Sequence, residues 1–515
     1  MKSLVISDRD FEQLMTKRSR KLFELAKYVS ELESSEKALN RPLLGELLSQ
    51  SIQLEELLDT YGAANNCRWC QLRSLTAAMK LFTDVSYEIL HIQHAFPAYR
   101  LLPIEHDFVK ATGQALRFTA DVILQTAKGT VEQAYELGLA EDLKSDHRQE
   151  YAKQLPAGRL THNCSRVRTE TISETVSLLA TAFLNLAAES EHVHTAVRAQ
   201  PAEYGQYVLE SASEENLRAM ELRFHNLQSL YDTHVSGREA ENLDKDLPVL
   251  RGHISVVFHL LKTATLFAHY YERHVNKPVC SLLAAREPLV SAEALLTVLV
   301  EYSAAYISYY IDSARNLCQA MLKRYIEVDR IEVPVPPYRG FHVRPATLIA
   351  KLVQHYGSEV RMELEDERYD AAAALELFRA NEKLNAQKRR WLAEEISRLN
   401  IVPSQAQDKD MTSILQNVVL ALTEQSKLVV YEQPLQLQYQ PDERQKQQPL
   451  AEQIISQIAR LQTIGKVDID TDLKVTFVGD RRVLADIRLL AESGYGENSL
   501  GNNVELPKEL AYLRR

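Results

Sequence analysis

The stretch "PVPPYRGFHVRPATLIAKLV", residues 334–353, changes within a few positions from an extended segment to a helix. Gly340 permits a backbone conformation that other residues avoid. After it, apolar residues recur at three- and four-residue spacing, as on one face of a helix. Pro345 falls in the first turn, where its missing N–H removes no hydrogen bond. The pattern predicts a strand, a tight loop and an amphipathic helix, with His342 just before the helix.

Segments on both sides of this stretch predict a small sheet. Apolar and polar residues alternate in "IEVPV" (331–335), "EVRMEL" (359–364) and "DLKVTFV" (472–478), as in strands of an antiparallel sheet with one buried face. Helices are expected at 346–356 and in "RRVLADIRLLAESG" (481–494), covering one side of that sheet. The buried face is expected to contain Ile331, Val333, Val335, Val360, Met362, Leu364, Leu473, Val475 and Phe477.

A long, polar insertion, residues 380–469, separates the second and third of these strands. Helical periodicity predicts helices at 369–399, 411–425 and 450–462, and "KLVVYEQ" predicts an extra strand. The Gln-rich segment at 434–449 is poorly patterned and is expected to be a mobile loop.

The first 327 residues contain little Gly or Pro and follow a helical period almost throughout. We expect a helical bundle at 1–155, and a second bundle or a continuation of the first at 156–328. The segment "LPAGRLTHNCSRV" (155–167) would form the break. The predicted fold class is therefore α+β and multidomain, with an all-α region followed by an α+β domain at 329–515.

Length, charge and cysteine content limit the function classes. A chain of 515 residues suggests roughly three domains. The net charge of −10 gives no general reason to expect nucleic-acid binding. No apolar run is expected to reach the length of a membrane span, and the N-terminus does not resemble a signal peptide. Five cysteines are a sparse, odd set that suits a reducing compartment. We predict a cytoplasmic protein without nucleic-acid or membrane partners.

The position of His342 predicts a chemistry. The start of a helix has partial positive charge, which disfavours a protonated ring and leaves a neutral imidazole that can act as a nucleophile. An anion on the ring would meet the free amides of Val343 and Arg344 and the Arg344 guanidinium. The alternative is that His342 only caps a surface loop.

The segment "GFHVRPATLIAKL" (340–352) resembles the active-site signature of HPr, the histidine phosphocarrier of the sugar phosphotransferase system, in which Gly-Leu/Met-His-Ser/Thr/Ala-Arg-Pro-Ala is the pattern. The order of strands and helices is also similar, and "LKVTFVGDRRVLADIRLLAESGYGE" (473–497) resembles the last strand and closing helix of that family. The resemblance covers roughly 330–380 and 470–497. It implies an open-faced β-sandwich, an antiparallel sheet covered by helices.

The resemblance also implies roles for individual residues. His342 would be the phosphoryl acceptor through Nδ1, Arg344 would stabilise the phosphoryl group, and Gly340 and Pro345 would shape the loop and the helix start. An apolar docking surface for partners would comprise Phe341, Ala374, Leu375 and Phe378.

Four features depart from the family pattern. Val343 replaces a small or hydroxyl residue, and its β-branched side chain restricts the space beside the ring. Arg339 adds a positive charge. Ala373 stands nearest the position of a regulatory serine, so control by a serine kinase there is not expected. The insertion at 380–469 is absent from the compact carrier.

Two other kinds of motif raise the question of metal binding. "CRWC" (67–70) lacks the further ligands of a zinc site, so packing is its simpler interpretation. Glu88 with His91, and Glu189 with His192, have the i, i+3 spacing of two-iron helical bundles. A metal-dependent helical-bundle enzyme is therefore an alternative, although no metal site and no cofactor is predicted.

The function predicted from the sequence is an HPr-like phosphocarrier, or a phospho-dependent regulator, of a phosphotransferase system, a phosphoryl carrier rather than a stand-alone enzyme. Its partners would be an enzyme I-type donor and an EIIA-type or other protein acceptor. A further alternative is a regulatory or scaffolding protein whose HPr-like module no longer turns over phosphate.

Overall fold

The computed structural model describes residues 5–32, 39–140, 143, 172–235, 244–276, 288–403, 411–431, 435, 437, 439 and 447–513. The chain forms two compact units, Met1–Met321 and Leu322–Arg515. It is mostly helical and contains a small antiparallel sheet, which agrees with the predicted α+β class. The expected break at 155–167 lies outside the described residues.

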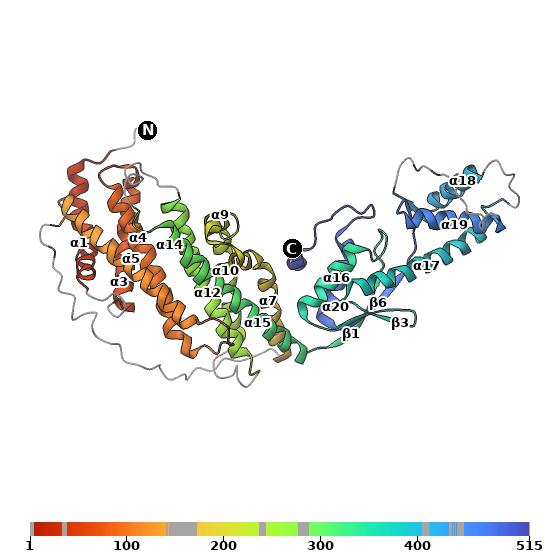
Figure 1. Ribbon diagram of the computed structural model, residues 1–515, viewed down its shortest axis with the longest axis horizontal. Coiled ribbons are helices and arrows are strands. Elements are labelled where there is room, and N and C mark those ends of the chain that lie inside the picture. Colours follow the sequence, from red (N-terminus) through yellow and green to blue (C-terminus); the bar gives the residue numbers. More distant parts are fainter. Residues whose placement is uncertain are drawn as a thin grey trace. The chain divides into compact units, whose positions relative to one another are not determined.

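The first unit consists of long helices that lie alongside one another (Figure 1). Helices α4 and α12 belong to the two expected bundles, and they pack against each other within the same unit. The helices are α1 (Asp8–Ser30), α3 (Arg41–Thr60), α4 (Cys70–Ala95), α5 (Phe108–Glu136), α7 (Ile172–Glu189), α8 (Glu191–His194), α9 (Tyr204–Glu210), α10 (Glu214–His234), α12 (Leu247–Tyr270), α14 (Ala292–Thr297) and α15 (Ala305–Arg324). Short segments of 3₁₀ helix are η1 (Ala63–Asn65), η2 (Phe96–Ala98), η3 (Thr195–Arg198) and η4 (Pro201–Glu203), and short segments of π-helix are η5 (Tyr271–Val275) and η6 (Val298–Ala304).

Several of these helices begin at a capping side chain. Ser7 accepts a hydrogen bond from the Asp10 amide, and Asp107 accepts one from the Lys110 amide. Such caps satisfy first-turn amides that have no carbonyl partner within the helix, and each typically contributes about 1 kcal/mol. The start of α1 and of α5 is thus encoded locally.

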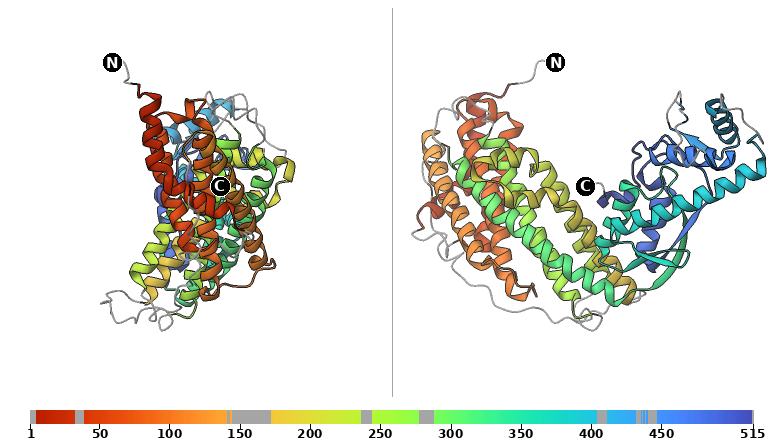
Figure 2. Two further views of the ribbon diagram at one scale, coloured as in Figure 1. Left: turned by 90° about the vertical axis from the view of Figure 1, so that its left-hand side faces the viewer. Right: turned by 45° about the vertical axis from the view of Figure 1, so that its right-hand side comes forward.

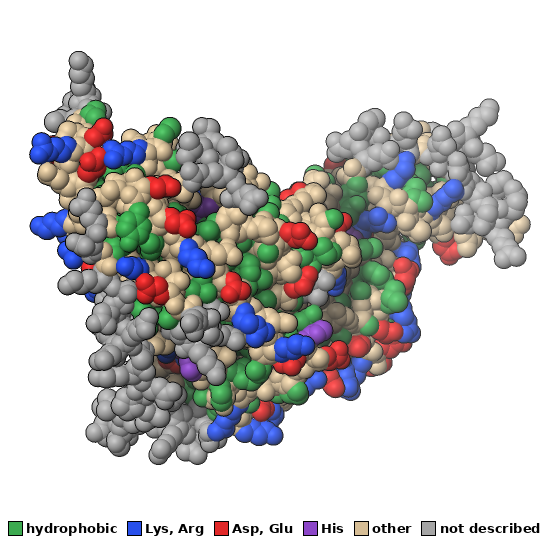
Figure 3. All heavy atoms as spheres, turned by 60° about the vertical axis from the view of Figure 1, so that its left-hand side comes forward, with side chains coloured by type: hydrophobic (Ala, Val, Ile, Leu, Met, Phe, Trp, Pro, Cys, Tyr) green, Lys and Arg blue, Asp and Glu red, His purple; other side chains and the backbone are tan. Residues whose placement is uncertain are grey.

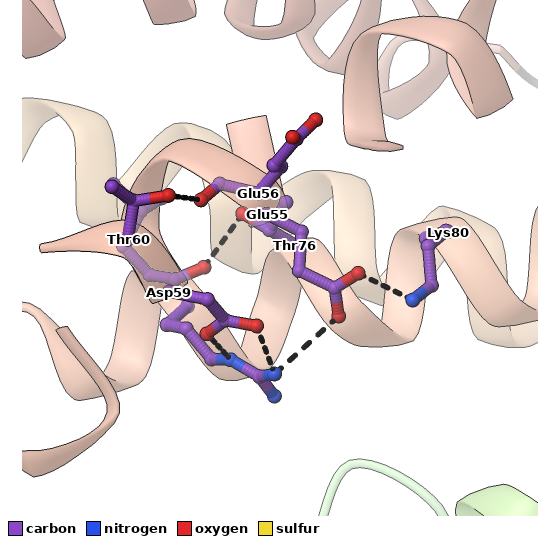
Figure 4. A network of polar contacts seen from close by, with 8 residues as sticks. Glu55, Glu56, Asp59, Thr60, Thr76 and Lys80 are labelled. Atoms are coloured by element: carbon purple, nitrogen blue, oxygen red, sulfur yellow. Dashed lines mark hydrogen bonds and ion pairs between the residues drawn. The ribbon is translucent and has the colours of Figure 1, made fainter. Parts of the chain in front are cut away.

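Charged side chains connect α3 with α4 (Figure 4). Arg73 donates two hydrogen bonds to the Asp59 carboxylate, at 2.7 and 2.8 Å, and Lys80 pairs with Glu55. The hydrogen bond from Arg73 lowers the pKa of Asp59. Acidic residues on α3 thus face basic residues on α4, which favours one register between the two helices. Figure 3 shows that charges of both signs are interspersed over the visible face of the helical unit.

One helical segment, Ala292–Arg324, is long and apolar enough by length and composition to cross a membrane. This corrects the expectation that no run reaches that length. Within the most apolar window of this segment, 72% of the residues are buried inside the protein. Core helices of soluble proteins meet the same criterion.

The second unit contains a four-stranded antiparallel sheet in the order β1-β6-β2-β3. Its strands are β1 (Val328–Pro334), β2 (Val360–Leu364), β3 (Glu367–Asp370) and β6 (Lys474–Asp480). Phe477 is opposite Ile331 on one side and Met362 on the other. The expected alternation is confirmed, because Ile331, Val333, Val335, Val360, Met362, Leu364, Val475 and Phe477 are buried; Leu473 is only half-buried.

Helices α16 (Val343–Tyr356) and α20 (Arg481–Glu492) cover one face of this sheet (Figure 1). Helix α20 buries one apolar face, which consists of Val483, Leu484, Ile487, Leu490 and Ala491. The chain then continues through the short turns η8 (Gly494–Gly496) and η9 (Lys508–Leu513).

The insertion has a core of its own. Helix α17 (Ala374–Leu399) leads from the sheet to α18 (Met411–Glu424) and α19 (Leu450–Thr463) without a break at residue 380 (Figures 1 and 2). The predicted extra strand is β4 (Leu428–Val430), which pairs with β5 (Val467–Ile469) in a separate two-stranded sheet. Residues of all these elements form one buried apolar cluster. Most of the expected loop at 434–449 lies outside the described residues.

Candidate functional site

The loop between β1 and α16 has an unusual backbone. Arg339 and Gly340 both adopt left-handed conformations, with φ of 56° and 63°. His342 then returns to an extended conformation as the residue before α16, as the sequence predicts. A non-glycine residue in the left-handed region costs free energy unless the surroundings hold it, so a contact must stabilise Arg339.

Asn381, in α17, supplies that contact. Its side chain accepts a hydrogen bond from the Phe341 amide at 2.9 Å and donates one to the Arg339 carbonyl at 3.0 Å. A Cβ atom at Gly340 would collide with the Asn381 side-chain oxygen. Glycine is therefore required at 340 for two reasons, the backbone conformation and the close approach of α17.

The imidazole of His342 is bound by Glu497. The distance from Nε2 to the Glu497 carboxylate is 2.6 Å, and Glu497 is only 2% exposed. An ionised carboxylate only accepts hydrogen bonds, so Nε2 carries the proton. In the neutral ring Nδ1 then has a lone pair available for reaction. The His342 and Tyr338 rings also form a T-shaped contact, with centroids 5.4 Å apart.

The start of α16 presents free donors beside this ring. The amides of Val343 and Arg344 have no carbonyl partner inside the helix, the His342 side chain does not cap them, and Pro345 has no N–H. The positive end of the helix dipole lies at the same place. The Arg344 guanidinium, in contrast, donates a hydrogen bond to the Gly496 carbonyl at 3.2 Å. Arg344 therefore binds the segment that positions Glu497.

A cavity of about 150 Å³ lies beside His342. The insertion supplies most of its wall, from α17, α19 and β5. Its lining residues are Arg339, His342, Asn381, Glu382, Asn385, Arg389, Gln462, Thr463, Val467 and Asp468. The insertion is thus part of the His342 site and not a separate appendage.

Both acidic and basic side chains line this cavity. Asp468 is 2% exposed, and its carboxylate is matched by the buried Lys388 ammonium at 3.0 Å and by the Gln462 amide at 3.0 Å. The Arg339 guanidinium packs against Gly465. Within the described residues, neither Arg339 nor Arg389 has a carboxylate within ion-pair distance.

The expected docking surface needs one correction. Phe341 is fully buried, because its ring packs against Phe477 and Tyr495, and it offers no surface to a partner. Leu375 is 74% exposed and Ala374 and Phe378 are half-buried. Val343, which the sequence indicated only as restricting the space beside the His342 ring, is 69% exposed.

The Glu-x-x-His pairs of the first unit have other partners. Glu88 accepts hydrogen bonds from His259 at 2.7 Å and from Lys262 at 2.6 Å, and Glu189 pairs with Arg223. Across the described residues, no group of three or more His, Cys, Asp or Glu side chains could hold a metal ion. The two-iron hypothesis therefore lacks its ligand set there. Cys67 and Cys70 are not joined by a disulfide, and the Cys70 thiol donates to the Cys67 carbonyl at 3.8 Å.

Sequence reasoning missed Glu497, Asn381 and Arg389 as site residues. Glu497 lay within the stretch that resembles the family, but no local spacing connects it with a histidine 155 positions earlier. Asn381 and Arg389 lie on the polar side of a long helix, where such residues are usually solvated.

Comparisons with protein-family models, with curated proteins and with solved structures found no match to this chain.

Proposed function

We propose that residues 322–515 form an HPr-like phosphoryl-accepting unit, with His342 as the acceptor. The observation that carries the proposal is the bond between Nε2 and Glu497, which leaves Nδ1 unprotonated at the start of α16. The order strand, His loop, helix, strand and closing helix supports the same function. Leu375 and Val343 provide exposed apolar side chains for a docking partner.

The proposed step needs no proton transfer from Nδ1. The Nδ1 lone pair attacks the phosphorus of a phosphohistidine on an enzyme I-type donor. The N–P bond of the donor breaks, and its imidazole leaves with the electron pair and takes up a proton. Glu497 keeps its hydrogen bond to Nε2 and offsets the positive charge that develops on the ring. The amides of Val343 and Arg344 face the transferred dianion.

The transferred group would then pass to an EIIA-type or other protein acceptor, or remain as a signal. A phosphoryl group adds charge and acceptor oxygens at one helix end, which can order or repel a neighbouring segment. A second candidate function is a regulatory or scaffolding module without turnover. The insertion favours this second function, because the cavity wall that it forms encloses one side of His342, whose side chain is 25% exposed.

Labelling distinguishes these functions. The full chain is incubated with an enzyme I-type donor and radiolabelled phosphoenolpyruvate. We expect acid-labile label on wild type and on His355→Ala, which removes another histidine of α16, and no label on His342→Ala. Wild type without label, across several donors, would favour the scaffold. Label that persists in His342→Ala would contradict the assignment of the acceptor.

A further inference from the structure

The cavity beside His342 has an unmatched positive charge. Arg339 and Arg389 both line it, and neither has an ion-pair partner among the described residues. Asp468 is already matched by Lys388, and of the remaining lining side chains only Glu382, which is exposed, is acidic. Two guanidinium groups on one small cavity form the donor set that binds phosphate and carboxylate groups.

Gln462 fixes part of the cavity wall. Gln462 is 8% exposed, and its Nε2 donates to Asn385 at 3.2 Å and to Asp468 at 3.0 Å. These two acceptors fix the orientation of the amide. Its Oε1 is buried and has no hydrogen-bond partner. This oxygen is also shielded from the cavity, so it is not an acceptor for a ligand.

The size of the cavity limits the ligand. Its volume is about 150 Å³, which is the size of closed cavity that holds a benzene-sized molecule. The exposed side chains of Arg339 and Glu382 place one side of it at the solvent. A small ester fits this space.

We propose that this cavity binds a small phosphate monoester, of the size of a phosphorylated three-carbon polyol. The phosphate lies between the guanidinium groups of Arg339 and Arg389. The ligand binds without a covalent bond and next to His342. Its binding therefore responds to, or competes with, a group bound to the His342 ring. Binding does not depend on whether His342 accepts a phosphoryl group.

Calorimetric titration of the full chain tests this inference, with glycerol 3-phosphate, inorganic phosphate and glycerol as probes. We expect glycerol 3-phosphate to bind, inorganic phosphate to bind as well because the phosphate is the group that the arginines recognise, and glycerol not to bind. Arg389→Gln should weaken binding of the ester at least about tenfold, since a charge-assisted pair is lost. Raising the salt concentration should weaken it as well.

A neighbouring arginine supplies the matched control. Arg390 is exposed and lies 4.0 Å from Glu365, outside the cavity lining. Arg390→Gln should therefore bind the ester as wild type does. Arg339→Asn gives a second test of the cavity, because asparagine tolerates the left-handed backbone at this position. A cooperative thermal transition in each variant verifies that it is folded.

The outcomes separate this inference from phosphotransfer. His342→Gln cannot carry a phosphoryl group, and it should retain binding of the ester within a few-fold. If wild type binds none of the phosphates, or if Arg389→Gln binds the ester as well as Arg390→Gln does, the inference is wrong even when His342 accepts label. Binding that persists in a protein without label would remove the phosphotransfer proposal alone.

Discussion

At the scale of single residues, Glu497 decides what His342 can do. A histidine at a helix start can present either ring nitrogen, and its tautomer depends on the partner of the other nitrogen. Here the buried carboxylate accepts a hydrogen bond from Nε2–H, so the reactive lone pair is on Nδ1. Arg344 contributes indirectly, because its bond to the Gly496 carbonyl holds the chain next to Glu497.

Removal of the Glu497 carboxylate should change both the tautomer of His342 and the rate at which His342 is phosphorylated. In Glu497→Ala, the nitrogen spectrum of His342 should show a mixture of tautomers instead of the Nε2–H form. Its phosphorylation by a donor should slow about 10- to 100-fold, the usual effect of losing a group that orients a ring. Glu492→Ala, an exposed residue of α20, is the control. Unchanged spectra in Glu497→Ala would show that the tautomer is fixed by another group.

At the scale of elements, the start of α17 holds the loop that precedes α16. The Asn381 side chain pairs with the backbone on both sides of Gly340, at Arg339 and Phe341. Phe341 in turn fills the core between Phe477 and Tyr495. The loop is therefore fixed from the insertion side and from the sheet side, which keeps His342 in place without a side-chain cap on α16.

Substitution at Gly340 tests this packing. Gly340→Ala introduces a Cβ that strains the left-handed backbone and also collides with Asn381. Gly494→Ala has the strain alone, because its Cβ would meet nothing within 4 Å at φ +75°. By denaturant unfolding we expect a loss of about 1–2 kcal/mol for Gly494→Ala, and about 1–3 kcal/mol more for Gly340→Ala, as in overpacked sites.

The double variant Gly340→Ala, Asn381→Ala separates the two causes. Removal of the Asn381 side chain relieves the collision, so the two substitutions together should cost less than the sum of their separate effects. Strict additivity would show that the close approach of α17 does not limit residue 340.

At the scale of the whole molecule, two compact units have separate cores and different buried ionisable groups. In the first unit, His253 is fully buried and joins two segments. Its Nδ1 donates to the Tyr310 carbonyl and its Nε2 accepts from the Leu102 amide, both at 3.1 Å, an arrangement that only the neutral ring can make. Burial lowers the pKa of His253, and likewise those of His91 and His274, to about 4.

Acid should therefore destabilise the first unit. Between pH 6.5 and pH 4 the unfolded chain binds protons that these folded histidines do not, so the free energy of unfolding falls as the pH falls through this window. His253 alone accounts for about 3 kcal/mol of this change. Thermal unfolding followed from pH 7 to pH 4 should show the corresponding transition moving to lower temperature.

Two variants check the origin of this pH dependence. His253→Gln should be less stable than wild type at pH 7, but its stability should fall less steeply with acid. His225→Gln, which replaces an exposed histidine of α10, should keep the full dependence. Equal slopes in His253→Gln and wild type would assign the effect to other groups.

Local patterns in the sequence predicted most elements of the second unit. The alternation in residues 331–335 and 359–364 specified strands and their buried face, because side chains of a strand point to opposite sides in turn. The periodicity of 346–356 and 481–494 specified α16 and α20. The position of His342 before a helix followed from Gly340 and Pro345, whose backbone preferences are intrinsic.

The surroundings of His342 depend on tertiary packing. Interactions between neighbouring residues, in contrast, are enough to place a histidine at a helix start beside a small sheet. The pairing of Nε2 with Glu497, the burial of Phe341, and the cavity that Arg339 shares with Arg389 join residues far apart in the chain. Such contacts depend on how the insertion and the closing helix pack, and no local periodicity encodes that approach.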